Sequence, residues 1–141
     1  MMPQSLTRLY AHLIFSTKNR KRFLNDEIQL RVNGYLATVV RNLDSQFVVV
    51  GGAADHVHIL FDIGKLHAPV KFVEQVKRES SKFVKTLGTE FQNFYWQRGY
   101  GMFSLAQRTA QRWKRTFETR NNIIVKRRSG GVSNAPGTKR H

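Results

Sequence analysis

Hydrophobic and polar residues follow one another along the first part of the chain in a pattern that predicts both strands and helices. Three short segments rich in β-branched and aromatic residues, at 9–15, 47–50 and 56–61, predict strands. Between the first two segments, apolar residues recur at helical spacing. This spacing predicts a helix over 26–43, with Asn25 as its N-cap.

A second helix is expected to begin near Pro69, because proline suits the first turn of a helix. Its apolar positions recur as far as Leu87, and Gly88 follows as a stop signal. The segment 94–103 contains two glycines and alternates loosely, which indicates a strand or a hairpin. The predicted order is βαββαβ, an α+β fold. It corresponds to a ferredoxin-like sandwich, an antiparallel sheet with two helices on one face, followed here by a C-terminal helix or basic tail.

The composition is that of a single globular domain. The chain has 141 residues, of which 40% are hydrophobic and 11% aromatic. No stretch is long and apolar enough for a membrane span, and no signal-peptide pattern begins the sequence, so we expect a cytoplasmic protein without a membrane partner. The absence of cysteine excludes disulfides, thiolate metal sites and cysteine nucleophiles.

The positive charge is large and unevenly distributed. The net charge of +15 favours a polyanion as partner, most commonly a nucleic acid. Ten of the 24 Lys and Arg residues, but only one of the nine acidic residues, follow residue 104. We therefore expect a folded core at 1–104, a distinct basic region at 105–125 and a tail at 126–141 whose composition predicts disorder.

Two histidines on the third predicted strand are the strongest candidates for a chemical site. Residues two apart on a strand face the same side of the sheet, so His56 and His58 project together. Paired imidazoles suit a divalent metal ion, but a third ligand is needed, and an oxygen ligand favours Mg²⁺ or Mn²⁺ over zinc. Asp55 is adjacent but is expected to point to the other face. The alternative is a pair of histidines without a role, because the motif is short.

The whole pattern resembles the HUH single-tyrosine transposases, which comprise insertion-sequence enzymes and relatives associated with repetitive extragenic palindromes. The resemblance extends over about residues 7–104. Several linked motifs in one order make it more specific than the histidine pair alone. These motifs are HLIFSTKNR at 12–20, DHVHIL at 55–60, SSKF at 80–83 and WQRGYGMFS at 96–104.

This resemblance implies metal-dependent cleavage and rejoining of single-stranded DNA that carries hairpins. In the family a tyrosine hydroxyl attacks a phosphodiester and forms a 5′-phosphotyrosine link, which conserves the bond energy for rejoining. By resemblance, His56 and His58 are catalytic residues that hold Mg²⁺ or Mn²⁺, which polarises the scissile phosphate. The resemblance also implies a homodimer.

Basic residues of the core are the candidates for contact with DNA phosphates. They lie on the loop after the first strand and on the polar side of the second helix, and comprise Lys18, Arg20, Lys21, Arg22, Lys77, Arg78, Lys82 and Lys85. A solvated face is the alternative for the helix cluster. Tyr95, Trp96 and Tyr100 are candidates for stacking on bases, although aromatics on a hairpin more often belong to a core.

The sequence departs from the family where the nucleophile should lie. In the family, a helix after the Gly-Tyr-Gly-x-Phe-Ser stretch carries the tyrosine, a metal-binding glutamine four residues later, and a His-His pair. This chain has no tyrosine after Tyr100, and Thr116 and Phe117 occupy the expected position of the nucleophile. Thr116 is a poor substitute because its hydroxyl is weakly acidic, and Glu118 is a weakly supported substitute ligand.

Residues 115–126 have a property that accounts for this departure. They can be written with synonymous codons that, read from the last base of the Arg115 codon, encode Tyr-Ile-Arg-Asn-Gln-Glu-Gln-His-His-Arg-Lys. That string is the missing family helix. We therefore hypothesise a frameshift, natural or from a sequence error, between about Leu105 and Gln111, which makes 105–125 a degenerate tyrosine-helix region. The alternative is an authentic basic arm that binds phosphate backbone.

A non-catalytic module of the RNA-recognition type is the rival function. Such modules stack bases on aromatic residues of a sheet strand, and the run Arg98-Gly99-Tyr100-Gly101-Met102-Phe103 fits that pattern superficially. This reading leaves the adjacent histidines unexplained. A basic structural protein of the ribosomal kind would explain only the charge.

Overall fold

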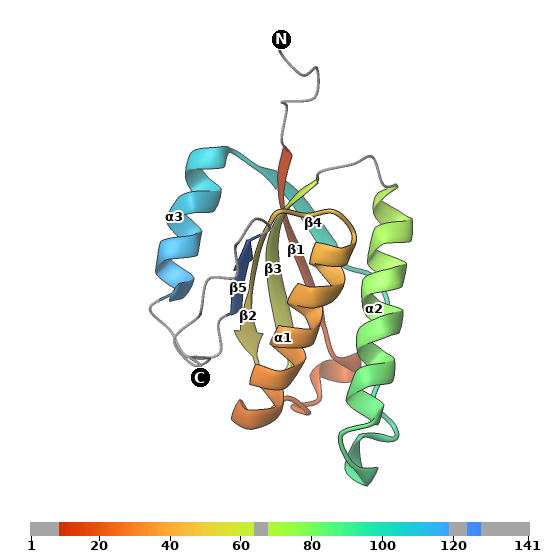
Figure 1. The fold of residues 1–141 in the computed structure, drawn as a ribbon. Helices are drawn as coiled ribbons and strands as arrows, with labels where there is room; N and C mark the ends of the chain where they lie inside the picture. Colours follow the sequence, from red (N-terminus) through yellow and green to blue (C-terminus); the bar gives the residue numbers. More distant parts are fainter. Residues whose placement is uncertain (1–8, 64–67, 119–123, 128–141) are drawn as a thin grey trace.

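The computed structural model describes residues 9–63, 68–118 and 124–127, with the backbone alone for 117–118 and 124–127. Five strands and three α-helices make up this part of the chain (Figure 1). Short 3₁₀ turns lie at Lys18–Arg20 and Thr89–Phe91. The elements are β1 (Leu9–Ser16), α1 (Asp26–Asn42), β2 (Phe47–Ala53), β3 (His56–Ile63), α2 (Pro69–Lys85), β4 (Gly101–Leu105), α3 (Gln107–Glu118) and β5 (Ile124–Arg127).

The strands form one antiparallel sheet in the order β4-β1-β3-β2-β5. The first four strands and the helices α1 and α2 form the βαββαβ arrangement, which confirms the predicted ferredoxin-like fold. Strands β1 and β3 lie at the centre. Their register pairs Ile14 with His58, so His12 and His58 are diagonal neighbours on one face of the sheet.

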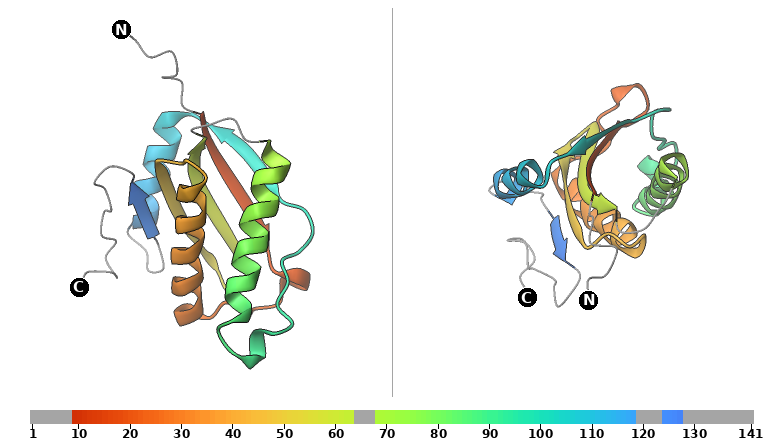
Figure 2. Two further views of the ribbon diagram at one scale, coloured as in Figure 1. Left: turned by 45° about the vertical axis from the view of Figure 1, so that its right-hand side comes forward. Right: turned by 90° about the horizontal axis from the view of Figure 1, so that it is seen from above.

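The two faces of the sheet are covered differently. Helices α1 and α2 lie on one face, and α3 lies on the opposite face, as both views of Figure 2 show. The main core fills the space beneath α1 and α2. On the other face, Val49 and Leu60 are fully buried and form a smaller cluster with Trp113 of α3. The C-terminal helix therefore covers the face that carries the even-numbered residues of β3.

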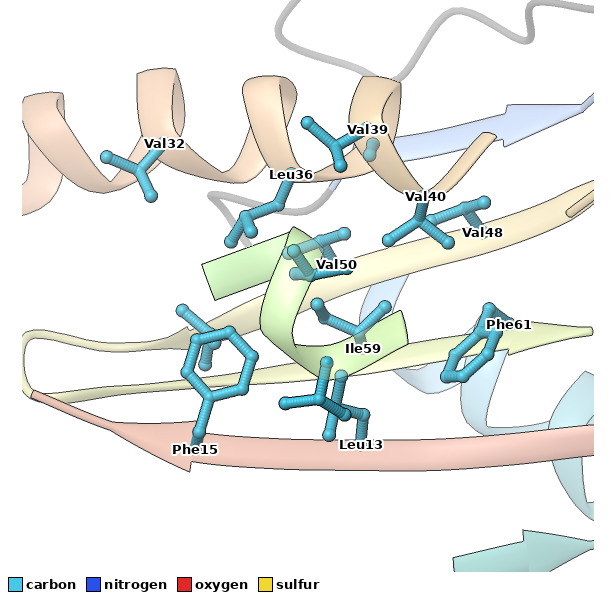
Figure 3. Packing of buried hydrophobic residues seen from close by; sticks show 14 of the residues in the cluster. Leu13, Phe15, Val32, Leu36, Val39, Val40, Val48, Val50, Ile59 and Phe61 are labelled. Carbon is cyan, nitrogen blue, oxygen red and sulfur yellow. The ribbon is translucent and has the colours of Figure 1, made fainter. Parts of the chain in front are cut away.

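Alternation along the strands builds the main core. Leu13, Val50 and Ile59, from β1, β2 and β3, are fully buried and point toward the helices (Figure 3). Leu36, one of the apolar residues that recur at helical spacing along α1, packs onto these three side chains. Phe61 is 1% exposed and stacks on Phe72 of α2, with ring centroids 4.8 Å apart. Because these residues face inward, the residues between them on β1 and β3 are turned to the other face.

Glycine at position 52 allows the tight connection between β2 and β3. Gly52 has a φ of +155°, and a Cβ atom there would lie 2.3 Å from the carbonyl oxygen of His56. A side chain would therefore force the start of β3 to move. The close approach of the two backbones sets where β3 begins, and so places His56 at its first position.

The predicted helices agree well with the structure. Helix α1 spans Asp26–Asn42, and the side chain of Asn25 accepts a hydrogen bond of 3.1 Å from the backbone N–H of Ile28, as expected of an N-cap. Pro69 begins α2, as predicted. The helix ends at Lys85, with Thr86 as its C-cap, and Gly88 precedes the 3₁₀ turn that begins at Thr89.

The prediction of a strand or hairpin over the whole of 94–103 is wrong. The strand β4 begins only at Gly101, and the preceding residues form an irregular segment with a single β-bridge, between Thr17 and Trp96. Gly99 has a φ of +87°, a left-handed conformation that interrupts an extended strand. The segment 94–100 crosses the end of the sheet, where it contacts the loop after β1.

The described residues of the basic region after residue 104 include two regular elements. Helix α3 occupies 107–118. Strand β5 pairs with β2, and it continues through the boundary that we expected between residues 125 and 126. The remainder of the predicted tail, 128–141, lies outside the described residues. None of the helices in the described part of the chain has the length and apolar content needed to cross a membrane.

Candidate functional site

The structure brings the two predicted histidines together on β3. His56 and His58 lie on the sheet face opposite the main core, and their ring centroids are 4.9 Å apart at an interplanar angle of 82°. Both side chains are partly exposed, because the neighbouring residues Val57 and Ile59 take the buried positions. This is the side-by-side arrangement that the period of a strand predicts.

Each of these imidazoles makes a hydrogen bond through its Nδ1 atom. His56 Nδ1 lies 2.8 Å from Oδ1 of Asp55, and His58 Nδ1 lies 2.9 Å from Nε2 of His12. Histidines that bind metals in proteins use one ring nitrogen as the ligand and place the other in such a hydrogen bond. In both histidines, Nε2 is the ring nitrogen that lies outside these hydrogen bonds.

The expectation that Asp55 points away from the histidines is wrong. Asp55 lies in the turn before β3, where strand alternation does not apply, and its carboxylate lies between His56 and Arg20. Arg20 Nε donates to Asp55 Oδ2 at 3.0 Å. The hydrogen bonds from His56 and Arg20 hold the pKa of Asp55 down at about 2. Asp55 therefore orients His56, with its oxygens already engaged.

A third histidine, which the sequence analysis did not select, completes the cluster. His12 of β1 is 9% exposed, and its ring lies at an interplanar angle of 21° to that of His58, with centroids 5.1 Å apart. Trp113 on α3 forms a T-shaped ring pair with His12, with centroids 4.9 Å apart. Burial lowers the pKa of His12, so the ring is uncharged near neutral pH. The alternation of β1 could have placed His12 on this face, but only the strand register sets it beside His58.

A cleft of about 390 Å³ opens beside the histidine pair. It is bounded by the end of β1, the 3₁₀ turn that follows it, and the irregular segment before β4. Its lining residues are Ile14, Phe15, Ser16, Arg20, His56, His58, Gln97, Arg98, Gly99 and Tyr100. Arg98 was not among the predicted site residues, although it lies in the motif that carries the resemblance. The phenol ring of Tyr100, 41% exposed, borders the same space.

The predicted DNA-binding residues fall into two groups. Six of them are exposed, namely Lys18, Arg20, Lys21, Arg22, Arg78 and Lys82. Lys77 and Lys85 are partly buried, and burial lowers the pKa of both. Lys77 Nζ donates to the carbonyl oxygens of Gln97 at 2.8 Å and of Gly99 at 2.6 Å. Lys85 Nζ donates to the carbonyl oxygen of Phe94 and lies over the ring of Tyr95.

These two lysines attach the irregular segment 94–99 to α2. The segment contributes one wall of the cleft, so Lys77 positions that wall from behind. Tyr95 is exposed, and the ammonium groups of Lys18 and Lys85 lie 5.9 and 4.2 Å from the centroid of its ring. Trp96 is partly buried, with its ring edge-on to Phe15 and its indole N–H donating to Ser80. Trp96 is therefore part of the packing between α2 and the sheet.

Replacing Lys77 by methionine is expected to loosen this wall. The substitution keeps the aliphatic length but removes two charge-assisted hydrogen bonds, which we expect to lower the free energy of unfolding by about 2 kcal/mol. Amide hydrogen exchange at Gln97 and Gly99 should accelerate. The matched control is Arg78→Met, at the next position of α2, where the side chain is exposed. Equal stability of the two variants would contradict the role of Lys77.

The donor atoms fit part of a divalent metal site. Two imidazole nitrogens suit Mn²⁺, and less strongly Mg²⁺. Within the ranges that the structure describes, no group of three or more His, Cys, Asp and Glu residues could hold a metal ion. The remaining ligands would therefore come from elsewhere. Thr116 is exposed on α3, and the side chains of Phe117 and Glu118 lie outside the described residues.

Comparison with known proteins identifies the family. Residues 5–118 match the family model described as transposase, IS200-like. A comparison with curated proteins found no match. The match to the family model spans most of the chain, including α3. The chain belongs to the IS200-like transposase family, which confirms the resemblance noted in the sequence.

Two solved structures share the fold. A Deinococcus radiodurans R1 protein described as a transposase has a TM-score of 0.66 at 20% identity, over 86% of this chain and 97% of its own. A REP-associated tyrosine transposase bound to a REP hairpin has a TM-score of 0.55 at 12% identity. That match covers 78% of this chain and 64% of the other protein.

Proposed function

We propose that this protein is a single-tyrosine DNA transposase that has lost its nucleophile, and that it still binds hairpin-bearing single-stranded DNA in the cleft beside His56 and His58. The observation that supports this most directly is the cleft itself, in which paired histidines adjoin two arginines in a member of a transposase family. The similar fold of a transposase bound to a REP hairpin supports the choice of a DNA hairpin as ligand.

The residues of the cleft suit a nucleic-acid strand. Arg20 and Arg98 supply guanidinium groups for phosphate oxygens, and guanidinium binds such oxygens through two parallel hydrogen bonds. Tyr100 offers an exposed ring on which a base can stack. The exposed Lys18 and Lys21 flank Arg20 on the same loop and extend the positive surface along the backbone of the DNA.

His56 and His58 are proposed to hold a Mg²⁺ or Mn²⁺ ion through their Nε2 atoms. When bound, such an ion neutralises charge on the scissile phosphate. Asp55 contributes by accepting the Nδ1 proton of His56, which fixes the ring and leaves Nε2 unprotonated. Arg20 contacts the same carboxylate, so the loop that is proposed to bind DNA also supports the metal site.

The chemistry proposed for the family requires a phenol that this chain lacks on α3. The tyrosine oxygen loses its proton and attacks phosphorus, so that a P–O bond forms to the enzyme while the bond from phosphorus to the 3′ oxygen breaks, and the 3′ oxygen takes up a proton. The hydroxyl of Thr116 is far less acidic than a phenol, whose pKa is about 10. We therefore propose that the protein binds DNA but does not cleave it, and that the frameshift hypothesis explains the loss.

Binding without cleavage is the expected result of the first experiment. The full chain is incubated with Mn²⁺ and hairpin oligonucleotides from the flanks of its gene, and fluorescence anisotropy is compared with that of unstructured strands. Preferential hairpin binding is expected, and a denaturing gel should show no covalent adduct. The variant Arg20→Met with Arg98→Met should weaken binding about tenfold or more, because two phosphate contacts are lost. Equal affinity for hairpin and unstructured DNA would refute the proposal.

A homodimer is part of the same proposal and is tested by light scattering on the free protein.

The rival function, an RNA-recognition module, receives less support from the structure. Tyr100 precedes β4, so it does not share the strand alternation with Phe103 that a base-stacking platform needs. Helix α3 also covers part of the sheet face that such a module leaves open. Stronger binding of single-stranded RNA than of DNA hairpins would favour the rival.

A further inference from the structure

The two candidate ligands are supported by chemically different partners. A carboxylate can only accept a hydrogen bond, so the contact between His56 and Asp55 places the proton of His56 on Nδ1. The partner of His58 is another imidazole, His12, and an imidazole can donate or accept. The protonation pattern of His58 therefore depends on which ring carries the shared proton.

Only one of the two patterns leaves His58 able to bind a metal ion through Nε2. If His12 donates, Nδ1 of His58 accepts and the single proton of the neutral His58 ring is on Nε2. If His58 donates, its Nε2 is unprotonated, and His12 accepts through Nε2 while its own proton is on Nδ1. The second pattern matches the state that Asp55 enforces on His56.

The surroundings of His12 hold it in place for this role. His12 is 9% exposed, and burial favours its uncharged ring, which can accept a hydrogen bond. Its ring is nearly coplanar with that of His58 and forms a T-shaped pair with Trp113 of α3. Phe103 of β4 is the third aromatic neighbour, with ring centroids 6.3 Å apart. The packing of α3 against the sheet therefore helps to position the ring of His12, which contacts His58.

We propose that His12 is a positioning residue, which accepts the Nδ1 proton of His58 and so fixes His58 in the tautomer whose Nε2 atom can bind a metal ion. This rests on the proposed function for the identity of the ligand, but the tautomer itself is a property of the metal-free protein. His12 does for His58 what Asp55 does for His56. Trp113, through its contact with His12, links the C-terminal helix to the metal site.

The tautomer can be measured directly. In metal-free, ¹⁵N-histidine-labelled protein near neutral pH, long-range ¹H–¹⁵N correlation spectra distinguish protonated from unprotonated ring nitrogens. We expect His58 to be protonated on Nδ1, whereas a free histidine prefers the proton on Nε2. A wild-type His58 protonated on Nε2 would overturn the proposal, whether or not any variant folds.

Two substitutions at one position separate hydrogen bonding from packing. His12→Gln retains an acceptor, the carboxamide oxygen, and should preserve the Nδ1-protonated form of His58. His12→Leu removes the acceptor, so His58 should revert to Nε2 protonation and Mn²⁺ affinity should fall about 10–100-fold. Asp55→Ala is the matched control, which should change His56 and leave the tautomer of His58 unchanged. An unchanged tautomer in folded His12→Leu would refute the role of His12.

The result also separates this inference from the proposed function. An Nδ1-protonated His58 in a protein that does not bind Mn²⁺ would support His12 as the acceptor and refute the proposed metal site. Mn²⁺ binding with His58 protonated on Nε2 in the metal-free protein would support the metal site and refute the role of His12.

Discussion

Restoring the family's tyrosine segment on α3 is expected to turn a DNA-binding protein into one that forms a covalent DNA adduct. In this variant, residues 116–126 are replaced by Tyr-Ile-Arg-Asn-Gln-Glu-Gln-His-His-Arg-Lys, the string encoded in the alternative frame. Helix α3 already lies over the sheet face that carries the histidines, with Trp113 against His12. The restored phenol and the glutamine one turn later therefore supply the two groups that the present chain lacks.

The expected effect is the largest of those we predict. Nucleophilic enzymes accelerate their reactions by at least about 10⁶-fold, so the adduct should change from undetectable to readily visible on a denaturing gel with Mn²⁺. The matched control is the same replacement with phenylalanine in place of the new tyrosine, which should bind DNA and form no adduct. Adding His56→Ala and His58→Ala should also abolish the adduct.

Two outcomes would contradict this account. A restored variant that folds and binds hairpins but forms no adduct would refute the idea that the missing helix alone disables the protein. An adduct formed by the unmodified chain would show that another nucleophile acts, and Tyr100, which borders the cleft, would be the first residue to test. Sequencing the gene provides an independent check, because a coding region that cannot encode the alternative string excludes the frameshift.

The second large effect concerns stability. Phe61→Ala should lower the free energy of unfolding by about 3–5 kcal/mol, because it leaves a cavity beneath α2. Phe61 is 1% exposed at the centre of the sheet and stacks on Phe72, so neighbouring side chains cannot fill the space easily (Figure 3). Since small domains are stable by only about 5–15 kcal/mol, this loss would unfold part of the population at moderate temperature.

Urea unfolding followed by circular dichroism measures this change. Val70→Ala is the control, because Val70 lies on the same helix as Phe72 and is 56% exposed. It should change the free energy of unfolding by less than about 0.5 kcal/mol. A similar loss in both variants would mean that the contact between α2 and the sheet is not the main core of the domain.

Most of the fold could be predicted from local patterns. The helical spacing over 26–43 and the cap at Asn25 are local features, and the structure reproduces both. The segment 94–100 was not predictable in this way. It is held by Lys77 and Lys85 of α2, which are distant in sequence, and by a bridge from Trp96 to Thr17. Its irregular course follows from these long-range contacts rather than from its own alternation.

The sequence by itself determined that His56 and His58 face one way, because the period of a strand is a property of the backbone. It also determined the family, through motifs whose order is readable along the chain. Only the tertiary structure decided that Asp55 turns toward His56, and that His12 lies beside His58. The orientation of Asp55 depends on a turn. The position of His12 beside His58 depends on the register of β1 against β3, which is set by packing across the whole sheet.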